Sequence, residues 1–200
     1  MRLVAATTNP GKLREIESIL APLRLEIVPV STYPGLPEIE EDGTTFEENA
    51  VKKARLTAET TGEAALADDS GLEVDHLAGA PGVYSARFAG EPKSDAANNA
   101  KLLKLLEGVP WEKRAARFRC VIAVAVPGGP MLTAEGTCEG YILYELRGAG
   151  GFGYDPLFFV PEFGKTFAEL PPEVKNRISH RGAALREIKE KLTEFLKLRG

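Results

Sequence analysis

Two long strand-like runs follow one another near the middle of the chain, and a short turn separates them. The run ARFRCVIAVAV (116–126) is rich in β-branched and other apolar residues, and GPMLTAEGTCEGYILYEL (129–146) follows, with the turn Pro-Gly-Gly-Pro between the two. Gly and Pro between two such runs are typical of a hairpin turn. The pair therefore predicts long strands, and with them a long sheet on which the rest of the chain has to pack.

Shorter strand-like runs alternate with amphipathic segments on the N-terminal side of this pair. We expect strands over 2–7, 25–30 and 64–69, and helices over 9–23, within 37–62, over 95–108 and over 179–198. Thr44 with Glu47 fits a capping box for the second helix, and Ser179 is a candidate cap for the last one. Strands that alternate with helices and then continue as hairpins indicate an α/β fold. We predict a long twisted mixed β-sheet with flanking helices, in one domain over 1–200 with two lobes around a central cleft.

Composition and charge exclude several classes of protein. The formal net charge of −4 leaves no basic footprint for nucleic acid. The apolar stretch at the N-terminus is too short for a signal peptide core, and no run reaches the length of a membrane span. Cys120 and Cys138 lack the spacing of a zinc site, and we expect both to be buried, reduced thiols. We therefore expect a soluble, cytoplasmic protein that binds neither nucleic acid nor membranes.

Two aspartates stand side by side where the third expected strand ends. Asp68 and Asp69 follow an apolar run and precede Ser-Gly. Neighbouring carboxylates repel one another unless a cation or hydrogen-bond donors offset their charge. One interpretation is a solvated turn, since Asp, Ser and Gly are common in turns. The other is a strand end that aims both carboxylates at a cation in a ligand site.

The segment TTNPGK (7–12) joins the first strand to the first helix. Backbone N–H groups and the positive end of the helix point at such a junction, which suits an anion. Ala6 and Leu13 stand where a Walker A loop has glycine and Ser or Thr, so this is not a P-loop. A plain strand-to-helix turn is the alternative.

An acidic run without a basic residue precedes the second helix. It comprises Glu38, Glu40, Glu41 and Asp42, with Glu47 and Glu48 shortly after. Such runs are commonly solvated. Oxygen-only groups also suit Mg²⁺, however, which keeps several waters and needs few carboxylates beside substrate phosphates.

The glycine-rich segment GAGGFG (148–153) matches GxGxxG by letter. A dinucleotide-binding fingerprint has to open a helix, whereas the β-prone YDPLFFV follows here, so we reject that interpretation. The loop either folds Phe152 back onto the core or presents its ring to a flat base. Near the C-terminus, Lys175, Arg177, His180 and Arg181 gather before and at the start of the last helix, where an anion or an acceptor-rich ligand would favour cations. For His180 the alternative is an ordinary surface residue at a helix start. These features together predict a nucleotide with several phosphates.

Five segments resemble the inosine triphosphate pyrophosphatase family and occur in the family's order between residues 7 and 185. They are TTNPGK, TFEENAVKKA, ADDSGLEVDHLAGAPGVYSARFAG, GGFGYDPLFFVP and ISHRGAAL. The resemblance implies hydrolysis of non-standard purine nucleoside triphosphates (ITP, dITP and XTP) to the monophosphate and pyrophosphate. It also implies a long central mixed sheet, two lobes with the site between them, a Mg²⁺ requirement and a homodimer.

The resemblance further implies which residues form the site. Asp69 is expected to be the catalytic base and a magnesium ligand, joined by Glu40, with Glu41 and Asp68 as alternatives. Residues 7–12 and Lys53 are expected to face the phosphates, Ser70 to touch the substrate, and the later residues to hold the base and sugar. The complete expected substrate-binding set is Thr7, Thr8, Asn9, Pro10, Gly11, Lys12, Lys53, Ser70, Phe152, Gly153, Tyr154, Asp155, Lys175, His180 and Arg181.

The implied chemistry is metal-assisted hydrolysis at the α-phosphorus, with water activated by Asp69 or by the metal. Arg181 is expected to read the base, because a guanidinium donates to the 6-oxo group of hypoxanthine or xanthine and cannot accept from the 6-amino group of adenine. Two alternatives stay open at this point. One is a pyrophosphatase for other modified nucleotides, and the other is a regulator that binds a nucleotide without turnover.

Overall fold

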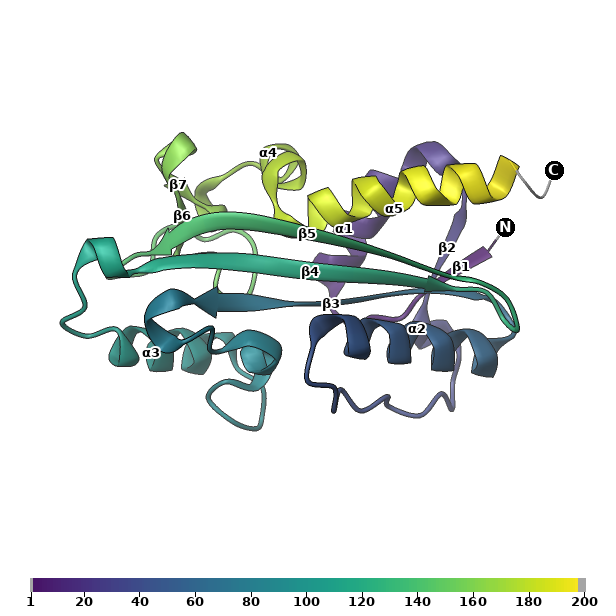
Figure 1. Ribbon diagram of the computed structural model, residues 1–200, viewed down its shortest axis with the longest axis horizontal. Coiled ribbons are helices and arrows are strands. Elements are labelled where there is room, and N and C mark those ends of the chain that lie inside the picture. Colours follow the sequence, from purple (N-terminus) through teal and green to yellow (C-terminus); the bar gives the residue numbers. More distant parts are fainter. Residues whose placement is uncertain (1, 198–200) are drawn as a thin grey trace. The chain divides into compact units, whose positions relative to one another are not determined.

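The computed structural model describes residues 2–197, which form a seven-stranded mixed sheet with the order β2-β1-β3-β4-β5-β6-β7 (Figure 1). The strands are β1 (Arg2–Ala5), β2 (Glu26–Pro29), β3 (Ala64–Val74), β4 (Ala115–Ala125), β5 (Met131–Ile142), β6 (Phe158–Val160) and β7 (Lys165–Thr166). β1 pairs in parallel with β2 and β3, whereas β6 pairs antiparallel with β5 and β7. The predicted α/β fold with a mixed sheet and flanking helices is confirmed.

Local capping explains where most helices begin. The helices are α1 (Pro10–Leu20), α2 (Phe46–Thr61), α3 (Asp95–Leu105), α4 (Pro172–Ile178) and α5 (His180–Lys197). Ser94 caps α3 by accepting from Ala97 N. The predicted capping residue of α2 is wrong by one position, because Thr45 accepts from the backbone N–H of Glu48, while the Glu48 side chain accepts from Thr44. The short helix α4 carries no strong apolar period and was not expected from the sequence.

The chain divides into two compact units. The first unit comprises residues up to Asp69, Cys120–Gly136 and the chain from His180 onward, and the second comprises Ser70–Arg119 and Thr137–Ser179. Strands β3, β4 and β5 each contribute residues to both units. The assignment of one domain over 1–200 with a cleft between two lobes stays a prediction.

In the first unit, helices cover both faces of the sheet: α1 and α5 lie on one face and α2 on the other (Figure 1). The apolar stripes of α1 and α5 bury Ile16, Leu20, Leu185, Ile188 and Leu192 against Leu3, Leu66 and Ile122 of the strands. Gly136 of β5 permits close contact with the start of α5, since a Cβ there would lie 2.1 Å from the carbonyl oxygen of His180. The first turn of α5 is therefore held tightly against the sheet.

The second unit has its own core. Phe118, Phe158 and Phe167 form an aromatic cluster with ring centroids 4.6 to 5.7 Å apart, which suits favourable edge and offset packing. Arg114, although 1% exposed, donates to the backbone oxygens of Leu106 and Ile142 and so satisfies carbonyls at the end of α3 and β5.

Strand β3 is longer than the sequence predicts. We expected it to end at Asp69, but it continues to Val74, because Leu72 and Val74 are fully buried in the core of the second unit. Asp68 and Asp69 thus lie in the middle of a strand and not in a loop. Both cysteines are free thiols; Cys120 is buried as predicted, whereas Cys138 is only partly buried. Within residues 2–197, no helix combines the length and apolar character that a membrane span requires.

Candidate active site

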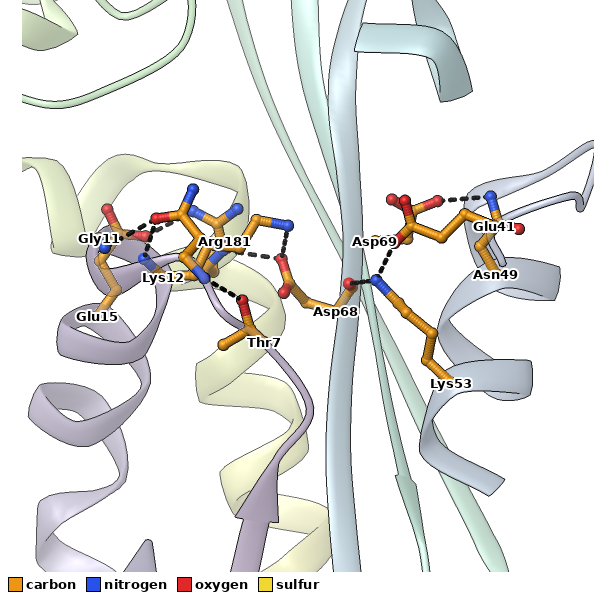
Figure 2. Close-up of polar contacts among 11 residues, drawn as sticks. Thr7, Gly11, Lys12, Glu15, Glu41, Asn49, Lys53, Asp68, Asp69 and Arg181 are labelled. Atoms are coloured by element: carbon orange, nitrogen blue, oxygen red, sulfur yellow. Dashed lines mark hydrogen bonds and ion pairs between the residues drawn. The ribbon is translucent and has the colours of Figure 1, made fainter. Parts of the chain in front are cut away.

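The two adjacent aspartates point to opposite faces of β3 (Figure 2). The parallel pairing of β1 with β3 ends at Ala5 and Leu66, so β3 has passed the carboxyl end of its neighbour when it reaches Asp68. Successive side chains of a strand alternate between its faces. Asp68 therefore faces α1 and α5, and Asp69 faces α2, which gives each carboxylate a separate environment.

On the α1 and α5 side, Asp68 lies in a buried network of charges. Its Oδ2 atom is 3.0 Å from Lys12 Nζ and 3.1 Å from Arg181 Nε. Glu15 Oε2 lies 2.6 Å from a terminal nitrogen of Arg181. Burial alone would raise the pKa of Asp68, but Lys12, Arg181 and Lys53 outweigh it and hold this pKa well below its usual range. Asp68 therefore stays ionised and ties α1 to α5.

This network changes two expectations. One interpretation of the neighbouring carboxylates is a single cation that both would face, but Asp68 is 1% exposed and is neutralised by protein cations on the face away from Asp69. Arg181 is also 1% exposed; its Nε donates a hydrogen bond to Asp68, and one terminal nitrogen donates to Glu15. Its expected role in reading the base stays a prediction, whereas its role in holding Asp68 is observed.

On the α2 side, Asp69 is 6% exposed and lies close to Asn49 and Lys53, which stand one helical turn apart. Asn49 Nδ2 donates to Asp69 Oδ2 at 2.9 Å. Lys53 Nζ donates to the backbone oxygen of Asp68 at 2.6 Å and pairs with the carboxylate of Glu41. Burial raises the pKa of Asp69; Lys53 opposes this and Glu41 adds to it, and the net shift is upward. A carboxylate with a raised pKa is a better proton acceptor than an exposed aspartate.

The donor chemistry around Asp69 fits Mg²⁺. Asp69 and Glu41 both lie beside Lys53 (Figure 2), and Mg²⁺ is commonly held by one or two carboxylates together with waters and phosphates. Among residues 2–197, no group of three or more His, Cys, Asp and Glu side chains could hold a metal by itself. The sequence favoured Glu40 as the second ligand, whereas the structure leaves Glu40 exposed and brings Glu41 to this group.

The predicted phosphate-binding loop has its helix N-terminus already capped. Asn9 Oδ1 accepts from the backbone N–H groups of Gly11 and Lys12, at 2.8 and 3.2 Å. Thr7 Oγ1 in turn accepts from the backbone N–H of Asn9 at 3.1 Å. A phosphate at this junction would compete with the Asn9 carboxamide for the helix donors. Binding of the triphosphate by residues 7–12 stays a prediction.

In the second unit, the glycine-rich loop organises a ring and a cation. Gly151 has φ +71°, and a Cβ on it would lie 2.1 Å from Asp155 Oδ2, so only glycine allows this approach. The same oxygen accepts from Phe152 N at 2.9 Å and from Lys175 Nζ at 2.7 Å. Lys175 Nζ lies 4.6 Å from the centroid of the half-buried Phe152 ring, a cation–π contact. The loop opens no helix, which confirms that it is not a dinucleotide fingerprint.

The remaining predicted residues differ in their surroundings. Tyr154 is buried and its hydroxyl donates to the backbone oxygen of Ser85 at 2.7 Å, so it serves the core of the second unit. His180 is buried at the start of α5, in the first unit. Ser70 is half-buried directly after Asp69, and Thr8 is exposed. Substrate contacts by these four residues stay predictions.

Comparison with known proteins decides the family. The sequence model of the Ham1 family matches residues 3–191. The chain belongs to the Ham1 family. A dITP/XTP pyrophosphatase from Desulforamulus reducens is 65% identical to this Ham1 protein over 195 residues, which cover 98% of this chain and 97% of that protein. A dITP/XTP pyrophosphatase from Geobacter sulfurreducens is 60% identical and covers 96% of both chains. The family resemblance seen in the motifs is confirmed.

Solved structures of Ham1 proteins have the same fold. A HAM1 protein from Coxiella burnetii superposes with a TM-score of 0.88 at 45% identity and covers 97% of this chain and 99% of its own. The crystal structure titled nucleoside-triphosphatase / dITP/XTP pyrophosphatase from Mycobacterium abscessus gives a TM-score of 0.76 at 42% identity, and covers 94% and 97%.

Sequence reasoning missed two residues beside the aspartates of this Ham1 protein: Glu15, which pairs with the Arg181 that contacts Asp68, and Asn49, which donates to Asp69. Glu15 lies next to the apolar stripe of α1, and its burial could have been suspected because it stands beside Ile16. Its partner Arg181 is too distant in sequence to be found without the fold. Asn49 stands one turn before Lys53 in TFEENAVKKA, where it reads as an ordinary surface amide. Its function as a donor to Asp69 appears only once α2 packs on β3.

The buried network predicts a large effect of Arg181 on stability. We expect Arg181→Met to lower the free energy of unfolding by about 3–5 kcal/mol, because Asp68 and Glu15 would stay buried without their shared cation. Urea denaturation followed by circular dichroism measures this. Arg186→Ala, which removes an exposed arginine from the same helix, is the control and should change the unfolding free energy by less than about 1 kcal/mol. Similar costs for the two variants would contradict the network's role.

Proposed function

We propose that this chain hydrolyses non-standard purine nucleoside triphosphates, ITP, dITP and XTP, to the nucleoside monophosphate and pyrophosphate. Relatives named dITP/XTP pyrophosphatase are 65% and 60% identical to it over almost its whole length. The observation that carries the proposal is the environment of Asp69, a buried carboxylate with a raised pKa beside Asn49 and Lys53. That environment suits a base that takes a proton from water.

We propose that the enzyme depends on Mg²⁺, held by Asp69 and Glu41 together with substrate phosphates and water. When bound, Mg²⁺ would neutralise phosphate charge and polarise the phosphorus–oxygen bonds. The support is the all-oxygen character of the two carboxylates and their position beside Lys53. Asp68 is left out of this set because its carboxylate is neutralised by Lys12 and Arg181.

The residues of this chain would then divide the reaction among them. Asn49 orients Asp69, and Asp69 accepts a proton from the water whose oxygen attacks the α-phosphorus. The bond between the α-phosphorus and the bridging oxygen breaks, and pyrophosphate leaves with the electron pair. Lys53 keeps its positive charge, because Asp68, Glu41 and Asp69 outweigh the effect of burial and raise its pKa, so it can offset charge on the departing group.

We further propose that the residues of the glycine-rich loop hold the base. The ring of Phe152 is positioned by Lys175 and would stack on the purine, while hydrogen bonds from other groups select its edge. The family resemblance also leads us to propose a homodimer. Multi-angle light scattering would give the mass of the assembly.

The test is hydrolysis of a panel of nucleotides. We expect kcat/KM for ITP, dITP and XTP to exceed that for ATP and GTP by on the order of 10². Phosphate should be released only when inorganic pyrophosphatase is added, because the immediate product is pyrophosphate. Phosphate released without that enzyme would place the cleavage at another bond. Activity confined to pyrimidine or methylated nucleotides, or binding of ITP without turnover, would favour the other two functions considered from the sequence.

A further inference from the structure

Both polar backbone groups of Gly153 are held by one helix. Its N–H donates to Asp95 Oδ2 at 2.8 Å, and its carbonyl oxygen accepts from Asn99 Nδ2 at 2.9 Å. Asp95 and Asn99 stand four residues apart at the start of α3, so they lie on the same side of the helix, one turn from each other. Helix α3 thus binds the backbone of Gly153 through the side chains of Asp95 and Asn99, an arrangement that we call the Gly153 clamp.

The clamp acts on the residue next to the proposed base platform. Phe152 precedes Gly153, and its own N–H is held by Asp155. Asp155 also binds Lys175, whose ammonium lies over the Phe152 ring. The backbone of Phe152 is therefore fixed on one side by Asp155 and on the other by α3. A ring fixed in this way loses little freedom when a base stacks on it.

The hydrogen bond from Asn99 to the Gly153 carbonyl accounts for a polar residue at this buried position. Asn99 is 5% exposed, and its Oδ1 atom is buried without a hydrogen-bond partner in the part of the chain that the structure describes. A buried acceptor left unsatisfied is unfavourable, and an apolar residue of similar size would avoid that cost. What the carboxamide provides is the Nδ2 donor for the Gly153 carbonyl, and this bond fixes which way the amide points.

We propose that Asp95 and Asn99 are positioning residues that set the affinity of the enzyme for the purine base by fixing the backbone beside Phe152. This inference rests on the proposed function, because it assumes that Phe152 stacks on the base. Neither residue would touch the reacting phosphates. Their loss should weaken binding of the nucleoside part and leave the chemical step unchanged.

The test separates nucleoside binding from pyrophosphate binding. Asn99→Ala should raise KM for ITP and the Kd of IMP about three- to tenfold, with kcat and the inhibition constant of pyrophosphate changed less than about twofold. Asn99→Asp should be worse than Asn99→Ala, because an acceptor would face the Gly153 carbonyl. The exposed Asp95→Ala should show the same pattern and gives a second test if Asn99 variants fold poorly.

Asn98 provides the matched control. It is buried beside Asn99 on α3, but its carboxamide binds the backbone of Ala86 and Ala89 instead of the loop. Asn98→Ala should lower the melting temperature at least as much as Asn99→Ala and leave KM within about twofold. Equal rises in KM for the two variants, an unchanged KM in Asn99→Ala, or equal weakening of IMP and pyrophosphate would overturn the proposal. A wild-type protein that binds IMP but does not hydrolyse ITP would instead refute the proposed function and leave the clamp to be judged by the Kd of IMP.

Discussion

Asp69→Asn should lower kcat for ITP and XTP by about 10²-fold or more while KM changes much less. The substitution keeps the size of the side chain and an oxygen that can accept from Asn49, but it removes the group that takes the proton and one carboxylate of the proposed metal site. Pyrophosphate release under saturating nucleotide measures kcat.

Asp75→Asn is the matched control for this substitution. Asp75 follows β3, is exposed, and pairs with Arg117 at 3.0 Å. Exposed ion pairs contribute little, so this variant should keep kcat within about twofold of the wild type. Near-normal turnover by Asp69→Asn would exclude Asp69 as the base, and an equal loss in Asp75→Asn would point to a general loss of structure.

Removal of divalent metal should abolish turnover. EDTA is expected to reduce the rate to background, excess Mg²⁺ to restore it, and Mn²⁺ to substitute in part, because the proposed ligands are oxygen atoms. Full activity in a metal-stripped sample would contradict the proposed dependence.

Neighbouring glutamates of the acidic loop test which carboxylate holds the metal. Glu41→Gln should raise the Mg²⁺ concentration for half-maximal activity by about tenfold or more, because it removes one of two charged ligands. Glu40→Gln removes the same charge from an exposed position and should change that concentration less than about twofold. The reverse ranking would restore the assignment that the sequence alone favoured. Titration of metal binding by calorimetry gives the same comparison without relying on turnover.

Local signals in the sequence predict much of the fold. The apolar stripe of Ile16 and Leu20, with Pro10 at the first helical position, identifies α1 because those signals act within a few residues. The end of β3 could not be predicted in this way. Asp68, Asp69 and Ser70 are turn formers by composition, but neighbouring strands and the burial of Leu72 override that preference.

The candidate site was predicted less completely, because its contacts also depend on tertiary packing and not on local sequence signals. Motif resemblance identifies Asp69 and Lys53, but it says nothing of the direction in which each side chain points. Arg181 illustrates this: its charge suggests a ligand contact, whereas the fold places it against Asp68 and Glu15. Ion pairs between segments far apart in the sequence depend on packing, and no local pattern reports them.

The alternation of Asp68 and Asp69 on β3 also limits how this gene can change in length. Insertion or deletion of a single residue between Ala64 and Asp68 would turn every later side chain of the strand to the opposite face. Asp69 would then face Lys12 and would lose its hydrogen bond from Asn49. Asp68 would turn away from Lys12 and Arg181 and would lose both ion pairs. A substitution in this strand alters one side chain, whereas a one-residue change in length displaces all the side chains that follow it in the strand. We therefore expect indels among functional homologues to fall in loops, such as the turn at 127–130, and not in this stretch.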